Sequence, residues 1–309
     1  MSASIGKLLR NFKVGDAVCR KSDNAVIKFM KISEINIYPI KSLAGISLKS
    51  SVVEERGLKF DRRRMLVDSS GRFISQRECP KMAALATEIG DRGLKIKSPE
   101  SGEIFVPFDV EGDSVSTTVW DSACRSIPYS REINDWFSSA LSVNCRLVLM
   151  PDDQRRGINP AFRQNDEIVS FADGYPLLLI GEASLNALNK RLEFPVPMNR
   201  FRPNLVVSGA EEFAEDLWST VSIGETVCRV VKPCARCVIT TIDQGTGEVT
   251  GKEPLKALAS FRMAKAVYPE NFQDLGLTET GVLFGQNLVP INFGETIKIG
   301  DSVTPIKTK

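Results

Sequence analysis

The sequence predicts a strand-rich α+β fold with barrel-like sheets. Short segments of alternating apolar and polar residues recur along the chain, separated by turns rich in Gly, Pro, Ser and Asp. These segments outnumber the apolar stripes that indicate helices, and the two types do not alternate regularly as in a parallel βαβ protein. Hydrophobic residues make up 42% of the 309 residues and charged residues 25%, which is typical of a globular protein.

The first half of the chain contains a strand that ends at Tyr38-Pro39 and two hairpins. A turn at 69–71 separates the strands of the first hairpin, and a turn at 99–102 separates those of the second. The predicted strands of this half cover residues 35–37, 65–67, 73–74, 94–97 and 104–106. Ile35 and Ile37 alternate with polar neighbours, and the other segments are short apolar or alternating runs bounded by turn residues.

Two apolar stripes at helical spacing predict helices. The first follows Ser130 and contains Ile133, Trp136, Phe137, Ala140 and Leu141; the second contains Leu185, Leu188 and Leu192. Further strands are predicted at 205–207, 227–231, 238–242 and 297–299. A polar, proline-containing stretch at 151–165 favours a division into an extension (1–30), a first β-rich domain (31–150) and a second domain (151–309).

Charge and composition exclude several classes of function. The net charge is +2 and no dense run of Lys and Arg occurs, so we expect no nucleic-acid partner. No apolar stretch approaches the roughly 20 residues of a transmembrane helix. The sequence contains no histidine, which excludes His-bearing zinc sites and Ser-His-Asp triads. Chemistry must therefore use Cys, Asp, Glu, Lys, Tyr or a bound cofactor.

The seven cysteines are an odd number without an evident disulfide framework. Without a secretory signal, they favour reduced thiols and a cytoplasmic location. Residues 1–28 leave an alternative open, because apolar residues at 5, 8, 9 and 12 alternate with Lys and Arg. They could form an organellar targeting segment or a membrane-surface helix, or they could be a frayed extension.

The most informative segment is the loop Lys232-Pro233-Cys234-Ala235-Arg236-Cys237, which lies between two predicted strands. Lys232 and Arg236 would favour thiolates, which are good ligands for soft or high-valent transition metals. Three alternatives stay open from spacing alone. A thioredoxin-like motif should begin a helix, whereas a strand is predicted here; a structural zinc site needs four ligands; and two ordinary buried cysteines would have no chemical role.

Five separated motifs together resemble the MOSC-domain family, and most closely its amidoxime-reducing branch, which includes the mitochondrial amidoxime reducing component and YcbX-type proteins. They are Tyr38-Pro39-Ile40-Lys41-Ser42, Asp61-Arg62, Phe201-Arg202-Pro203-Asn204, Pro233–Cys237 with Thr240-Thr241-Ile242-Asp243, and Leu283-Phe284-Gly285-Gln286. The likeness extends from about residue 31 to residue 305, and the order of the motifs makes it far more specific than a single C-x-x-C.

The resemblance implies a molybdenum cofactor, in which a pterin dithiolene binds the metal and Cys237 supplies a further ligand. The pterin carries a phosphate, which Arg and Lys side chains bind well. The residues that match the cofactor-binding positions of the family are Lys41, Ser42, Arg62, Asp173, Gly174, Arg202 and Arg236. Cys234 matches a family position whose role stays open. Asp243 is expected either to act near the metal as a catalytic residue or to end a strand before a turn.

The implied reaction reduces N-hydroxylated compounds such as amidoximes, hydroxylamines and N-hydroxylated nucleobases, and releases the oxygen as water. YcbX-type proteins often carry a ferredoxin domain that this sequence lacks, so we expect a separate electron donor, either a flavin reductase or a small redox protein. Ala235 and Asn287 also differ from some relatives. Pyridoxal phosphate binding and detoxification are further family properties. The alternatives are a molybdenum cofactor or sulfur carrier without turnover, and an interaction protein with an empty barrel.

Overall fold

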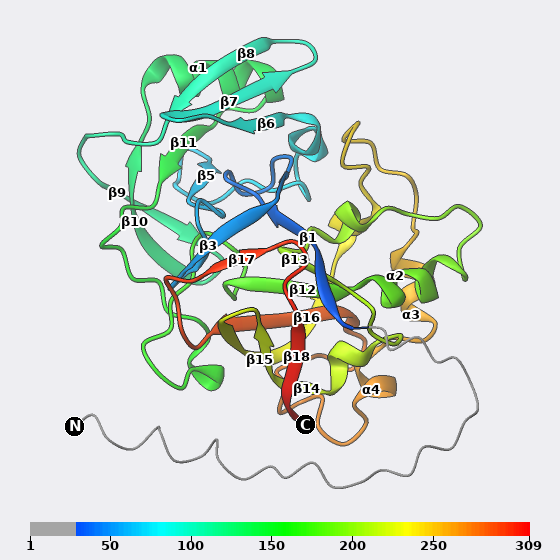
Figure 1. Cartoon of the computed structure of the whole chain (residues 1–309). Coiled ribbons are helices and arrows are strands. Elements are labelled where there is room, and N and C mark those ends of the chain that lie inside the picture. Colours follow the sequence, from blue (N-terminus) through cyan, green and yellow to red (C-terminus); the bar gives the residue numbers. More distant parts are fainter. Residues whose placement is uncertain (1–28) are drawn as a thin grey trace, which may run out of the picture.

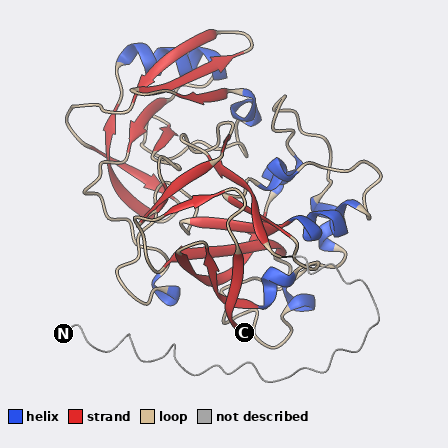
Figure 2. Ribbon diagram, viewed as in Figure 1, coloured by secondary structure: helices blue, strands red, loops and turns tan. Residues whose placement is uncertain are grey.

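A computed structural model describes residues 29–309, and strands are the dominant element in it (Figure 1; Figure 2). Figure 2 shows helices mainly around the outside of the strands. The strand-rich α+β fold predicted from the sequence is therefore confirmed. Among these residues no helix is both long and apolar enough to cross a membrane. The predictions for residues 1–28 fall outside the described part of the chain.

The largest sheet has eight strands and contains segments from both ends of the described chain. In spatial order these are β18 (Val303–Thr308), β14 (Trp218–Ile223), β15 (Thr226–Arg236), β16 (Val282–Pro290), β12 (Leu177–Gly181), β13 (Leu205–Ser208), β1 (Lys31–Ile37) and β2 (Ile46–Leu48). All neighbours are antiparallel except β12 and β13, which are parallel and lie on either side of α2 (Glu182–Asn189) in the sequence.

Three smaller sheets complete the strand content. One has four strands in the order β5 (Arg64–Val67), β11 (Arg146–Leu149), β10 (Ser122–Pro128) and β9 (Val115–Val119). Another contains β17 (Thr296–Lys298), β3 (Ser50–Glu54) and β4 (Gly57–Leu58), and the last contains β6 (Ala86–Ile89), β7 (Gly93–Ser98) and β8 (Gly102–Pro107). In Figure 1 the β6–β8 sheet lies with α1 at the top, opposite the end at which β14 and β18 lie.

The helical elements are short. The α-helices after α2 are α3 (Leu255–Ala259) and α4 (Ala264–Val267), and the longest helix is α1 (Arg131–Leu141). The 3-10 turns are η1 (Pro80–Ala84), η2 (Pro160–Phe162), η3 (Met198–Phe201), η4 (Ala214–Leu217) and η5 (Val238–Thr241). Ser130 caps α1 by accepting a hydrogen bond from the backbone N–H of Ile133, as its position before the apolar stripe suggests.

Two large clusters of buried side chains organise the core. One lies along the eight-stranded sheet and includes Ile35, Ile37, Leu179 and Leu205, none of which is exposed. The other packs α1 against the sheets of the first half, with Phe137 fully buried. The first cluster joins β1 to strands of the second half, so strands from both sides of residue 150 share one core. The domain boundaries proposed from the sequence stay a prediction.

Most of the predicted elements are present. The strand predicted at 73–74 is reduced to a single bridge between Phe73 and Val67, and one further predicted strand is wrong. The hairpin of β7 and β8 and the strands β1, β13, β15 and β17 lie where the sequence predicts them. Residues 238–242, however, were predicted as a strand and form η5 instead. The hydroxyls of Thr240 and Thr241 donate to the backbone carbonyls of Cys237 and Val238. These local hydrogen bonds stabilise a turn in competition with sheet pairing.

Candidate functional site

One pocket brings together all the predicted site residues except Asp243. Loops at the ends of β1, β4, β15 and the segments before β12 and β13 meet there, although they are far apart in the sequence. Its lining includes Lys41, Ser42, Arg62, Asp173, Gly174, Arg202, Arg236 and Cys237. The lining also includes Arg77, Cys234 and Asn287, which the family motifs did not assign to a definite role.

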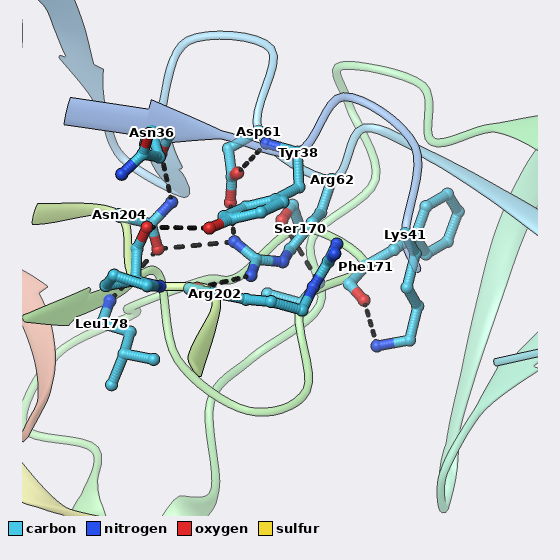
Figure 3. A network of polar contacts seen from close by, with 12 residues as sticks. Asn36, Tyr38, Lys41, Asp61, Arg62, Ser170, Phe171, Leu178, Arg202 and Asn204 are labelled. Carbon is cyan, nitrogen blue, oxygen red and sulfur yellow. Dashed lines mark hydrogen bonds and ion pairs between the residues drawn. The ribbon is translucent and has the colours of Figure 1, made fainter. Parts of the chain in front are cut away.

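Tyr38 organises two of the predicted cations. The guanidinium groups of Arg62 and Arg202 lie 4.4 Å and 4.2 Å from the centre of the Tyr38 ring, within cation–π distance (Figure 3). The Tyr38 hydroxyl donates to the carbonyl of Pro203 at 3.1 Å. Burial raises the pKa of Tyr38 to about 12, so the ring stays neutral between the two cations.

The buried carboxylate of Asp61 positions both Tyr38 and Arg62. Its carboxylate accepts hydrogen bonds from the backbone N–H of Tyr38 at 2.8 Å and from Arg62 at 2.7 Å (Figure 3). Burial alone would lower the pKa of Arg62, but Asp61 and Tyr38 raise it, and the net shift is upward. Burial lowers the pKa of Arg202 to about 10, which still leaves it protonated at neutral pH.

Three of the predicted binding residues adopt left-handed backbone conformations. The φ angles of Ser42, Arg62 and Arg202 are 70°, 49° and 54°. Non-glycine residues rarely adopt this conformation, and it is enriched at sites where surrounding contacts enforce it. Those contacts are visible at Arg62, whose backbone N–H donates to Tyr38 and whose carbonyl accepts from Phe171. The backbone of Arg62 thus connects two loops of the site.

The loop that carries Asp173 and Gly174 is held by two cations. Lys41 donates to the carbonyl of Phe171 at 2.9 Å and pairs with the carboxylate of Asp173 at 2.5 Å. Arg156, which the sequence did not single out, donates to the carbonyls of Ala172 and Asp173. Burial favours the neutral form of Asp173, but Lys41 outweighs this and the pKa falls below its usual range. The carboxylate is therefore ionised at the mouth of the pocket.

The cysteine loop lies at the end of β15, and its two thiols face different cations. Arg236 donates to the sulfur of Cys234 at 2.9 Å, whereas Arg77 donates to the sulfur of Cys237 at 3.2 Å. Lys232, expected beside the thiols, donates instead to the carbonyl of Gly276. Because the chain is extended here, three residues span roughly 10 Å, too far for a disulfide. This geometry does not fit a thioredoxin-like motif.

Arg77 is a residue of the pocket lining that sequence reasoning missed. It lies in the loop before η1, and its guanidinium also packs on the ring of Trp120 at 4.7 Å. The sequence around it, Gln76-Arg77-Glu78, looks like an ordinary polar surface turn. The contact with Cys237 spans 160 residues, so no local pattern could have indicated it.

Asp243 lies outside the lining of the pocket. Its carboxylate accepts hydrogen bonds from the backbone N–H groups of Gly245 and Thr246 and pairs with Arg200 at 3.1 Å. Backbone donation lowers the pKa of Asp243. These contacts are those of a turn residue, the second of the two roles that the sequence left open. They do not support a catalytic role near the metal.

The donor set of the pocket fits an anionic, phosphate-bearing ligand. Five cations and one carboxylate line it in the described chain: Lys41, Arg62, Arg77, Arg202, Arg236 and Asp173. The Nε of Arg236 is buried and has no partner in the structure. Among residues 29–309 no group of three or more Cys, Asp or Glu side chains is placed to hold a metal ion. A metal beside Cys237 would bring further ligands from its own cofactor, as the dithiolene of a molybdopterin does.

Comparison with known proteins places the chain in a family. Residues 29–144 match the MOSC N-terminal beta barrel domain, and residues 166–304 match the MOSC domain. The mitochondrial amidoxime-reducing component 1 of Xenopus laevis is 30% identical over 90% of this chain and 82% of its own length. The human protein of the same name is 31% identical over 88% of this chain and 82% of its length.

A third relative has a different name. The molybdenum cofactor sulfurase of Oryza sativa subsp. japonica is 30% identical over 79% of this chain, but the match covers only 32% of that longer protein. Two domain matches in order, with relatives similar over nearly the whole chain, agree with the motifs and with the pocket in which they meet. The chain belongs to the MOSC family, and its relatives over nearly the full length are amidoxime-reducing components.

Proposed function

We propose that this protein is a molybdenum cofactor-dependent reductase of N-hydroxylated compounds, with Cys237 as the metal ligand. One observation supports this most directly: the thiol of Cys237 and five cationic side chains line the same pocket. The names of the amphibian and human relatives support the substrate class. Amidoximes, hydroxylamines and N-hydroxylated nucleobases are the expected substrates.

The residues that line the pocket would have different roles in binding the cofactor. Lys41, Arg62, Arg202 and Arg236 would neutralise the phosphate of the pterin, and Arg77 would hold the Cys237 sulfur in position through its hydrogen bond. When bound, the molybdenum cofactor supplies the two-electron chemistry that removes oxygen from an N–OH group. Asp243 lies outside the pocket lining and is not proposed as a catalytic residue. We propose neither pyridoxal phosphate binding nor a role in detoxification.

Metal content tests the ligand assignment. The parent protein, Cys237→Ala and Cys234→Ala are purified from one molybdate-supplemented host that demonstrably makes the cofactor, and molybdenum per chain is measured. Cys234→Ala is the matched control, because it removes a thiol three residues away in the same loop. We expect near-stoichiometric metal in the parent and the control and its loss in a folded Cys237→Ala variant. Negligible metal in all three would refute the assignment. If Cys237→Ala keeps its metal, the contacts to the pterin are sufficient to hold the cofactor. The activity of this variant then decides whether Cys237 is a ligand.

Turnover separates the reductase from a carrier. The rice sulfurase relative keeps the carrier alternative open, since its matching part lies within a longer protein. The metal-loaded protein is supplied with electrons by reduced methyl viologen and tested with an amidoxime and a hydroxylamine. Product formation that depends on Cys237 supports the reductase. Rapid loss of the cofactor together with inactivity on both substrates favours the carrier.

The electron donor and the location are part of the same proposal. We propose a separate donor protein, either a flavin reductase or a small redox protein. The sequence favours a cytoplasmic location, whereas the relatives with mitochondrial names favour the organellar alternative. A fluorescent protein fused behind residues 1–28 distinguishes the two, because only a targeting segment will direct it to an organelle.

A further inference from the structure

A second cavity, of about 500 Å³, lies beside the cysteine pocket. Arg77 lines both, and Val238, which lines the second cavity, directly follows Cys237 in the chain. Ligand pockets for small molecules commonly have volumes of about 300–1,000 Å³. The second cavity therefore has room for a small organic molecule with one end close to the thiol.

Apolar side chains from several segments form most of this cavity. Val238 comes from η5, and Ile242 and Val249 come from the turn that follows it, where they form a single β-bridge. Leu255 and Ala259 come from α3 on another side. Val238 and Val249 are 52% and 60% exposed, although most of the valines that the structure describes are buried. Their exposure toward a cavity indicates a surface on which a hydrocarbon group would be buried.

The charged side chains of the cavity all have one sign. Arg77, Lys252 and Lys256 line it, and no Asp or Glu does so among the residues that the structure describes. Both lysines are exposed, so their ammonium groups can reach the solvent end of a bound molecule. A negative charge at that end would be favoured, and a positive charge would be repelled.

We propose that this apolar cavity binds the part of the substrate remote from the N–OH group, and that the substrates are N-hydroxylated compounds carrying an aryl or alkyl group that is neutral or anionic. The inference rests on the proposed function for the chemistry at Cys237. Because Arg77 lines both pockets and Val238 follows Cys237 directly, a substrate with its N–OH end near the thiol could place its hydrocarbon end between η5 and α3. Small polar hydroxylamines would leave the cavity unused.

Binding to the purified, metal-loaded protein tests this directly. Dissociation constants are measured by calorimetry, without turnover, for acetamidoxime, benzamidoxime and the 4-carboxy and 4-trimethylammonio derivatives of benzamidoxime. We expect benzamidoxime to bind at least about 10-fold more tightly than acetamidoxime, because the ring removes apolar area from water. The carboxylate derivative should bind more tightly than the trimethylammonio derivative. Equal affinity for the methyl and phenyl compounds would overturn the proposal.

Two variants locate the binding. Val249→Trp fills the cavity from an exposed position, and Ser260→Trp adds the same indole at an exposed position of the chain outside the cavity lining. Val249→Trp should weaken benzamidoxime at least about 10-fold and acetamidoxime less than about 3-fold, whereas Ser260→Trp should change neither. A phenyl preference that survives Val249→Trp would overturn the proposal.

A charge variant provides a second readout in case Val249→Trp does not fold. Lys252→Glu combined with Lys256→Glu should invert the preference between the two charged derivatives, whereas Lys265→Glu, on exposed α4, should not. If the double variant keeps the preference of the parent protein, Lys252 and Lys256 do not select the charge of the bound compound, and that part of the proposal is wrong. Failure of the proposed function can be distinguished from failure of this inference. It would abolish turnover of every amidoxime, whereas the phenyl preference in binding and its loss in Val249→Trp would persist.

Discussion

Replacing Asp61 with Ala removes the carboxylate on which the arrangement around Tyr38 depends. The side chain of Asp61 is 0% exposed and that of its partner Arg62 is 14% exposed. The substitution leaves the Arg62 guanidinium without its charge partner and the Tyr38 backbone N–H without its acceptor. Both groups are too buried for water to replace the lost charge partner and the lost hydrogen-bond acceptor.

The size of the effect follows from these contacts. Removal of one partner of a buried ion pair costs about 3–5 kcal/mol, and a lost acceptor costs about 1–3 kcal/mol. These costs overlap at a single carboxylate, so we expect a loss of about 4 kcal/mol in the free energy of unfolding. At about 2–4 °C per kcal/mol, the melting temperature should fall by about 8–16 °C. Asp61→Asn can still accept from Tyr38 and should lose about half as much.

Chemical denaturation monitored by tryptophan fluorescence measures the change. Asp153→Ala is the control, because it breaks an ion pair with Arg125 whose side chains are 71% and 46% exposed. Exposed pairs of this kind contribute at most about 1 kcal/mol. A loss below about 1 kcal/mol in Asp61→Ala, equal to that of the control, would refute the reasoning that the carboxylate supports the site.

Three further predictions concern single positions. Burial raises the pKa of Glu215 above its ordinary value of 4.5. The protonated carboxyl therefore contributes fully to the stability of the fold below that pH, and this contribution is lost as the pH rises through the folded-state pKa. Glu215→Gln should abolish this loss in denaturation midpoints measured from about pH 4 to about pH 8, and an unchanged slope would contradict it. Arg77→Ala should keep the fold and lower kcat/KM about 10- to 100-fold, as loss of a charged hydrogen bond implies, with partial rescue by Arg77→Lys; unaltered kinetics would exclude a positioning role. A Cβ on Gly45 would come within 2.5 Å of the Tyr38 ring, whereas one on Gly174 meets nothing within 4 Å. Gly45→Ala should therefore cost about 1–3 kcal/mol in thermal unfolding and Gly174→Ala almost nothing, and equal effects would show that the ring moves freely.

Local elements of the fold could be predicted from the sequence. The β7–β8 hairpin and α1 depend on alternation, turn residues and a capping serine that lie within a few residues of one another. The pairing of β1 with β13 could not be predicted, because it joins segments about 170 residues apart, as the hydrogen bond from Ser33 to Val206 shows. The error at η5 arose because a run of β-branched residues at 238–242 is typical of a strand, whereas the threonine hydroxyls donate to backbone carbonyls and form a turn.

More of the candidate site could be predicted from the resemblance to a family than from the C-x-x-C spacing alone. Ordered motifs identified six residues that the structure brings into one pocket, and a further match to the family added Asp173 and Gly174. Patterns could not identify Arg77 or Arg156, because each acts on a sulfur or carbonyl that only the folded chain brings near. They also left Asp243 ambiguous, since an Asp before Gln-Gly is equally suited to a turn and to a site.

The connection that Arg62 makes between Tyr38 and Phe171 has a consequence for synthesis on the ribosome. Lys41 and Arg62 emerge long before Cys237, and β1 gains its second neighbour in the eight-stranded sheet only when β13 has been made. The first third of the nascent chain therefore carries a strand that can pair only with β2, and a set of cations without a pocket. The proposed cofactor would find its complete pocket only after residues 202–237 have been made, so its insertion would be a late step.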